Sequence, residues 1–148
     1  MLNTITYHLS RKVPMRFAEA IERVTEELKK EGFGIITFID LKETFKNKIS
    51  EDFRNYVVLG ACNPKYAYKA LVADDKIGVF LPCSVVVQEH TNGDTEVSII
   101  NPEELLHSVH DPGLRTFATE IKEAMQNVLK SLSHRDINDR RANVEILM

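Results

Sequence analysis

Asn or Asp stands directly before proline at three places in this chain, and each place predicts the start of a helix. The three pairs are Asn63-Pro64, Asn101-Pro102 and Asp111-Pro112. Such a capping side chain accepts hydrogen bonds from the free N–H groups of the first helical turn. Proline suits the next position because it has no N–H to leave unpaired there. The third start opens a predicted helix over residues 112–132, with an apolar stripe along one face.

Hydrophobic periodicity predicts the elements of the first part of the chain. Residues 3–9 alternate as in a strand, and apolar residues recur every three or four positions from Phe17 onward, as on a helix that Gly32 ends. The run "GIITFID" at residues 34–40 is apolar on both sides, so it predicts a central strand covered on both faces. Asp40 is expected to cap a short helix that follows this strand.

A further buried strand and a hairpin are predicted in the middle of the chain. The segment "NYVVLGA" at residues 55–61 has the apolar composition of a buried strand. Residues 83–90 and 94–100 predict two hairpin strands joined at Asn92-Gly93. This dipeptide tolerates positive φ at both central positions, which predicts a two-residue type I′ turn.

The order of these elements predicts a single α+β domain over residues 1–132. Two helices are long enough to cover a sheet and a hairpin lies between them, which favours a layered α+β domain over a doubly wound parallel one. Residues 133–148 form a polar C-terminal extension in which Val144, Ile146 and Met148 alternate with other residues. An added strand, an arm packed on a partner subunit and a disordered tail remain open for this extension.

Charge and composition exclude several classes of protein. The net charge of −3 shows no basic excess, so nucleic-acid binding is not indicated. No apolar run approaches the roughly 18 residues that a membrane span requires, and the N-terminus lacks the pattern of a secretory signal. Two cysteines are too few for a disulfide-stapled scaffold. A cytoplasmic chain with reduced thiols is therefore expected.

The two cysteines, Cys62 and Cys83, are the candidate catalytic residues. Cys62 ends a predicted strand directly before the Asn63 helix start, where unpaired N–H groups favour a thiolate or a bound anion. Cys83 follows Pro82 and has no charged neighbour in sequence that would activate it. The alternative for both is that a small apolar side chain fills a tight corner of the core.

Other residues near Cys62 in sequence extend the candidate site. Lys48 and Arg54 flank the strand that leads to Cys62 and could place positive charge near a ligand. Tyr68 belongs to the helix that follows, and its polar-tipped ring suits a pocket wall or a subunit contact. A solvated face explains the two basic residues equally well.

Metal and nucleotide motifs are weak or missing. The cysteines are twenty residues apart rather than at the close spacing of zinc ligands, although His90, His107 and His110 could complete a mixed Cys/His site. The chain has no Gly-x-Gly-x-x-Gly, no Walker-type loop and no Gly-x-Ser-x-Gly elbow. No metal or other cofactor is expected.

Three segments, "KNKI", "YVVLGACNPKYAYKAL" and "IGVFLPCSVVV", together resemble domain-of-unknown-function family 302. The resemblance covers about residues 5–130. The residues that carry it are Lys48, Gly60, Cys62, Asn63, Pro64, Ala67, Leu71, Gly78, Leu81, Pro82, Cys83, Val85 and Val87. It implies a compact α+β domain with a curved, largely antiparallel sheet backed by helices, commonly a homodimer. It implies no reaction, substrate or cofactor.

Three functions remain open on this sequence. The first is a homodimeric ligand-binding or interaction module for an unknown small molecule. Its expected site residues are Lys48, Cys62, Asn63, Pro64, Tyr68, Pro82 and Cys83. The second is a thiol-dependent redox or sulfur-handling protein in which Cys62 is the reactive thiolate and Cys83 its partner. The third is a Cys/His metal-binding protein. Whether the chain is an enzyme is left undecided.

Overall fold

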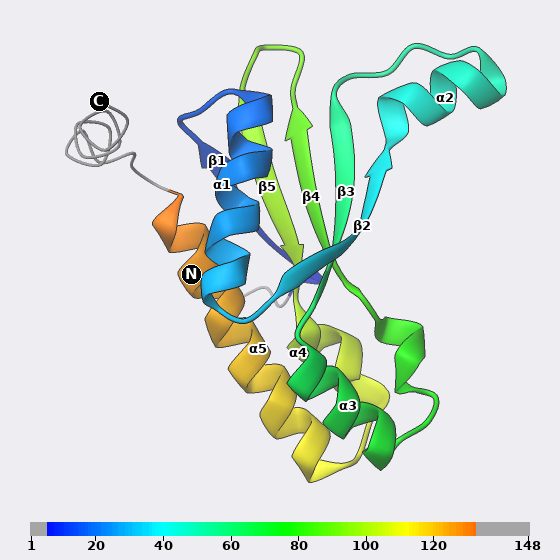
Figure 1. Cartoon of the computed structure of the whole chain (residues 1–148), viewed down its shortest axis with the longest axis vertical. Helices are drawn as coiled ribbons and strands as arrows, with labels where there is room; N and C mark the ends of the chain where they lie inside the picture. The colour runs from blue at the N-terminus through cyan, green and yellow to red at the C-terminus, as the bar shows by residue number, and fades with distance from the viewer. Residues whose placement is uncertain (1–5, 133–148) are drawn as a thin grey trace, which may run out of the picture.

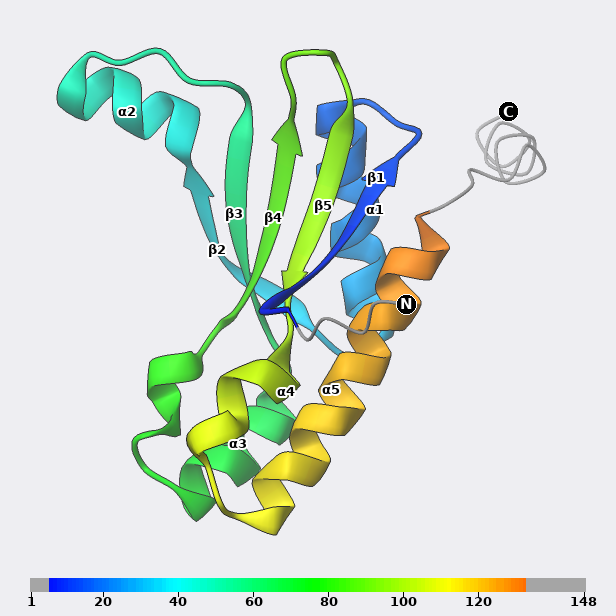
Figure 2. The same cartoon turned by 180° about the vertical axis from the view of Figure 1, so that it is seen from behind.

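Five antiparallel strands form one sheet at the centre of the structure, a computed structural model that describes residues 6–132 (Figures 1 and 2). Their order across the sheet is β1 (His8–Val13), β5 (Thr95–Ile100), β4 (Cys83–Glu89), β3 (Tyr56–Cys62) and β2 (Gly34–Asp40). β2 to β5 follow one another as a meander, and β1 joins the sheet beside β5. The predicted α+β class with an antiparallel sheet is confirmed.

Two helices, α1 (Phe17–Lys30) and α5 (Pro112–Ser131), cover one face of this sheet. Val24 and Leu28 of α1 are fully buried, as are Met125 and Val128 of α5. They pack on the inward side chains of β3, β4 and β5, namely Val57, Leu59, Val85, Val87, Val97 and Ile99. No helix within residues 6–132 covers the opposite face, which is turned toward the viewer in Figure 2.

Smaller helical elements lie at one end of the sheet (Figure 2). α3 (Pro64–Ala73), α4 (Pro102–Leu105) and a 3-10 helix at Leu106–Ser108 pack against α5, and a second 3-10 helix at Ile77–Phe80 packs against α3. The side chains of Asn63, Asn101 and Asp111 accept hydrogen bonds from backbone N–H groups in the first turns of α3, α4 and α5. All three predicted helix starts are confirmed.

The prediction that residues 34–40 form a central strand is wrong. β2 lies at the edge of the sheet, and Ile36, Phe38 and Ile39 are 61%, 58% and 46% exposed. Asp40 caps the next helix, α2 (Leu41–Ile49), as predicted. β2 starts beside α1, where Ile35 packs on the core, but its later part and α2 extend away from the two covering helices (Figure 1). Within residues 6–132, no helix therefore buries Ile36, Phe38 or Ile39.

The first strand and the hairpin turn also differ from their predictions. β1 starts at His8 rather than at residue 3, and the first five residues lie outside the described part of the chain. In the hairpin, Gly93 has φ +92 but Asn92 does not have positive φ, so the turn is not type I′. Asn92 instead accepts a hydrogen bond from the N–H of Asp94, and three residues join His90 to Asp94.

The structure leaves the C-terminal extension untested and contains no candidate membrane span among the described residues. The extension at residues 133–148 lies outside the described residues, so its three alternatives stay predictions. Within residues 6–132, no helix combines the length and the apolar composition that crossing a bilayer requires.

Candidate functional site

The two cysteines lie on neighbouring strands, where β3 ends and β4 begins. Cys83 is paired with Ala61 in the β3–β4 register, and Cys62 is one residue further along β3. Consecutive side chains of a strand point to opposite faces of the sheet. Ala61 and Cys83 therefore face the helix-covered core, and Cys62 faces the other way. Both thiols are free, and Cys62 is only partly buried.

Cys83 is a buried core residue with a weakly acidic thiol. Its side chain is 8% exposed and belongs to the main hydrophobic core. Burial, and in second place the neighbouring Cys62, raise the pKa of Cys83 to about 11. The thiol is therefore protonated at neutral pH, the opposite of what a reactive cysteine requires.

An apolar cavity of about 70 Å³ lies beside Cys83, between the end of the sheet and the helices α3, α4 and α5. Leu81, Leu114, Phe117 and Ile121 are among the side chains that line it. Pockets that hold small-molecule ligands usually measure about 300–1,000 Å³. The cavity next to Cys83 is well below that range.

The free N–H groups at the start of α3 are bound by the side chain of Asn63, the capping residue of this helix. Asn63 Oδ1 accepts from the N–H groups of Lys65 and Tyr66, at 3.1 and 3.4 Å. The Asn63 amide packs on Gly32, which has φ +88, so closely that a Cβ there would lie 2.9 Å from Asn63 Nδ2. Because Asn63 binds these N–H groups, they are not left to hold an anion or a Cys62 thiolate.

The remaining expected site residues are spread over the molecule. Pro64 is the first residue of α3, and Pro82 follows a cis peptide bond directly before Cys83. Tyr68 lies on α3 and is 73% exposed. Lys48 belongs to α2, at the opposite end of the molecule from α3 (Figure 1). The structure brings Cys62, Asn63, Pro82 and Cys83 to one end of the β3–β4 pair and places Lys48 apart from them.

The histidines are dispersed as well. His90 Nε2 lies 3.1 Å from Glu96 Oε1, and His107 Nε2 lies 3.6 Å from Glu104 Oε2. Between residues 6 and 132, no three His, Cys, Asp or Glu side chains are grouped so that they could hold a metal ion. The described residues therefore give no support to the Cys/His metal site.

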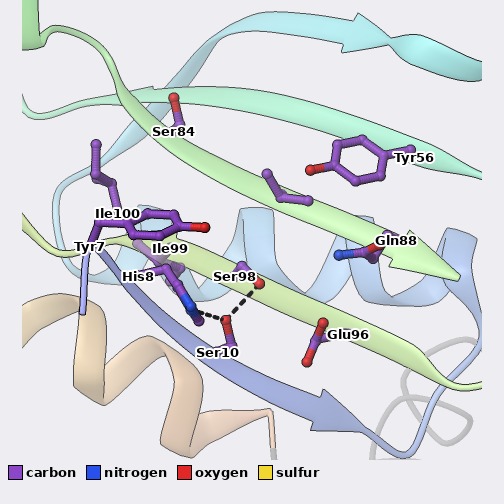
Figure 3. A pocket seen from close by; sticks show the side chains of 11 residues that line it. Tyr7, His8, Ser10, Tyr56, Ser84, Gln88, Glu96, Ser98, Ile99 and Ile100 are labelled. Carbon is purple, nitrogen blue, oxygen red and sulfur yellow. Dashed lines mark hydrogen bonds between the residues drawn. The ribbon is translucent and has the colours of Figure 1, made fainter. Parts of the chain in front are cut away.

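A larger hollow, of about 380 Å³, lies on the open face of the sheet (Figure 3). Side chains from β1, β3, β4 and β5 line it, together with Tyr7. His8 Nδ1 and Ser10 Oγ are 2.7 Å apart, and Ser10 Oγ lies 2.7 Å from Ser98 Oγ on the next strand. These residues were not among the expected site residues, although Ser98 and Glu96 alternate with apolar residues in the sequence of β5.

The two charged side chains beside this hollow, Arg54 and Glu96, each bind a neighbouring side chain. Arg54 Nε donates to Gln88 Oε1 at 3.0 Å, and the guanidinium lies 4.4 Å from the ring centroid of Phe53. Glu96 is paired with His90, as noted above. Gln88 is neutral, so Arg54 keeps its positive charge, and Gln88 lies opposite the acidic Glu96 in the β4–β5 register. The hollow therefore has hydroxyl, amide and aromatic groups with one charge of each sign nearby.

These observations define a small α+β domain whose antiparallel sheet has one face covered by helices and one open face with a hollow. Comparison with known proteins then gives the family. The family model "Domain of unknown function DUF302" matches residues 9–132, and the chain belongs to this family. The resemblance expected from the cysteine segments is confirmed.

A solved structure shows the same fold. The crystal structure of an uncharacterized conserved protein DUF302 from Bacillus stearothermophilus is similar, with a TM-score of 0.80 and 32% sequence identity. The match covers 86% of this chain and 99% of that chain. A search among proteins with curated descriptions found no match.

Proposed function

We propose that this domain is a self-associating interaction module in which residues 34–55, here called the arm, pack on the same arm of a second copy. The arm comprises β2, α2 and the segment that leads to β3. One observation carries the proposal: Ile36, Phe38 and Ile39 on β2 and Ile49 on α2 are each between 46% and 61% exposed. Large apolar side chains gathered on one projecting segment are typical of a protein contact.

The backbone of β2 adds to this argument. β2 pairs with β3 on one side and is the edge of the sheet on the other. An edge strand presents unpaired N–H and C=O groups, which readily pair with another strand. If β2 pairs with β2 of a second copy around a two-fold axis, the two strands run antiparallel. A two-fold axis is the commonest symmetry of protein dimers.

The charges of the arm also suit a second copy. The arm carries four acidic and four basic side chains, which are Asp40, Lys42, Glu43, Lys46, Lys48, Glu51, Asp52 and Arg54. Two arms of zero net charge do not repel each other, whereas a strongly charged partner would gain nothing from this surface.

Sedimentation of the full chain at micromolar concentration tests the proposal. We expect a dimer for the natural sequence and a monomer for the double variant Ile36→Lys/Phe38→Lys. The matched control is Val79→Lys, because Val79 is apolar and 82% exposed but lies outside the arm. A monomeric natural chain would overturn the proposal, as would a dimer that survives the double variant.

The geometry favours this function over a thiol-dependent one. Cys83, the expected partner thiol, is buried, and its raised pKa keeps it protonated at neutral pH. The arm, in contrast, places apolar surface where another chain can reach it.

A further inference from the structure

We propose that the hollow on the open sheet face binds a small, uncharged aromatic molecule that carries hydroxyl groups. No residue of the arm lines this hollow, so the inference goes beyond the proposed self-association. Its volume of about 380 Å³ lies within the usual range of small-molecule pockets.

The apolar part of the hollow suits a flat ring. Tyr7 and Tyr56 supply aromatic surface, and Figure 3 shows their hydroxyl groups turned toward each other across the hollow. Val86 and Ile100 add aliphatic surface between the strands. Aromatic and aliphatic walls of this kind bind an apolar ring, and polar groups at the edges set its orientation.

The side chains of His8, Ser10 and Ser98 form a row of hydrogen bonds that can either donate to a ligand hydroxyl or accept from it. When His8 Nδ1–H donates to Ser10, and Ser10 donates to Ser98, the Ser98 hydroxyl can donate onward to a ligand. When Ser98 donates to Ser10, and Ser10 donates to His8, the Ser98 oxygen accepts from a ligand instead. The tautomer of His8 decides between the two arrangements.

The second polar end of the hollow supplies a donor. Gln88 Oε1 accepts from Arg54 Nε, so the position of the Gln88 amide oxygen is held and its NH2 group is left to donate. Figure 3 shows this nitrogen directed into the hollow. A ligand with two hydroxyl groups can therefore meet Ser98 with one and Gln88 with the other.

Charge excludes ionic ligands of the same shape. Among the described residues that line the hollow, Glu96 is the one acidic or basic side chain apart from His8. The Glu96 carboxylate and the Arg54 guanidinium, which binds Gln88, place one charge of each sign beside the hollow. Neither an anion nor a cation therefore gains a net attraction that would offset the loss of its hydration, and an uncharged ring has no such loss.

Titration of the isotope-labelled full chain with catechol, followed by amide chemical shifts in NMR, tests the inference. We expect the largest shifts at His8, Ser10, Gln88 and Ser98. Benzoate and benzylamine, which carry opposite charges on a ring of the same size, should bind several-fold more weakly. Ser98→Ala should weaken catechol binding about five- to tenfold, as expected for the loss of one hydrogen bond. Ser131→Ala is the matched control, because Ser131 is an exposed serine at the end of α5.

Several results would overturn the inference. One is that the amide shifts lie outside the hollow or do not appear. A second is that benzoate or benzylamine binds more tightly than catechol. A third is that the Ser98→Ala and Ser131→Ala variants bind catechol equally well. Sedimentation of the same samples reports self-association separately, so failure of one proposal is distinguishable from failure of the other.

Discussion

Gly60 illustrates how side-chain size is restricted at single positions of the β3–β4 pair. A Cβ built on Gly60 would overlap Thr37 Oγ1 of β2 and would lie 2.6 Å from Pro82 Cγ. The glycine therefore allows β2 and the Leu81-Pro82 segment to approach β3 from both sides. This explains why a glycine occurs within an otherwise apolar strand.

The variant Gly60→Ala should lower the free energy of unfolding by about 1–3 kcal/mol, the usual cost of forcing extra volume into a packed region. Gly34→Ala is the matched control, because no atom lies within 4 Å of a Cβ built there. Urea unfolding of both variants measures the difference. Equal stabilities would contradict the packing described for Gly60.

The pKa of Cys83 predicts how stability changes at high pH. Burial raises the pKa to about 11 from the ordinary value of 9.0, so the folded chain holds its thiol proton at pH values where the unfolded chain loses it. The contribution of Cys83 to stability is thus complete below about pH 9 and is lost as the pH rises toward 11. Below that window the protonated thiol should react only slowly with iodoacetamide.

Comparison with Cys83→Ala isolates this effect from other groups that titrate at high pH. The stability advantage of the natural chain over the variant should shrink by on the order of 2 kcal/mol between pH 8 and pH 11. Urea unfolding across this range measures it. A constant difference, or rapid alkylation of Cys83 in the native protein at pH 7, would contradict the buried, protonated thiol.

At the scale of elements, Asn101 joins the start of α4 to the start of β1. Its Oδ1 accepts from the N–H of Glu103 at 3.2 Å, and its Nδ2 donates to the carbonyl of Thr6 at 2.9 Å. The side chain is 4% exposed, and its backbone N–H also binds the carbonyl of Tyr7. One residue therefore caps a helix and holds the strand end next to the open-face hollow.

Asn101→Ala should lower the free energy of unfolding by about 1–3 kcal/mol, since it leaves buried polar groups unpaired. Asp111→Ala removes a cap that is exposed and should cost less, about 0.5–2 kcal/mol. Asn101→Asp keeps the cap acceptor and loses the donor to Thr6, so hydrogen exchange should speed up in β1 more than in α4. Similar exchange in both elements would argue against the link.

The predictions from sequence succeeded for elements whose signal is local. Asn63, Asn101 and Asp111 each cap the turn that directly follows them, so their effect does not depend on the rest of the fold. The prediction of a central position for β2 was wrong, because an apolar run indicates a strand that avoids water but does not indicate which part of the molecule covers it. The predicted type I′ turn was wrong, because the Asn92 side chain binds the N–H of Asp94 and Asn92 does not adopt positive φ.

At the scale of the whole molecule, the helices cover one face of the sheet and leave both the open face and the arm uncovered. α1 and α5 pack on one face of the sheet, so the hydrophobic core is one-sided. The open face carries the hollow, and the arm carries exposed isoleucines and a phenylalanine. Neither surface could have been located from the sequence, because both depend on where the helices stop.

Self-association predicts that thermal stability depends on protein concentration. A partner that binds only the folded chain raises the unfolding temperature in proportion to the logarithm of its concentration. The unfolding temperature of the natural chain should therefore rise over a tenfold to hundredfold increase in concentration. That of the Ile36→Lys/Phe38→Lys variant should not. Calorimetry at several concentrations measures both, and a concentration-independent natural chain would contradict self-association.

The sequence by itself determined the positions of the capped helices, the two strands of the hairpin and the α+β class. These follow from interactions between residues close in the chain and from side-chain periodicity. The family was indicated separately, by the resemblance of the two cysteine segments. Only the tertiary structure decided that β2 lies at an edge, that Cys62 and Cys83 face opposite sides, and that His8, Ser10 and Ser98 meet across two strands. Strand order and register set these features, and both arise from packing between segments far apart in the chain.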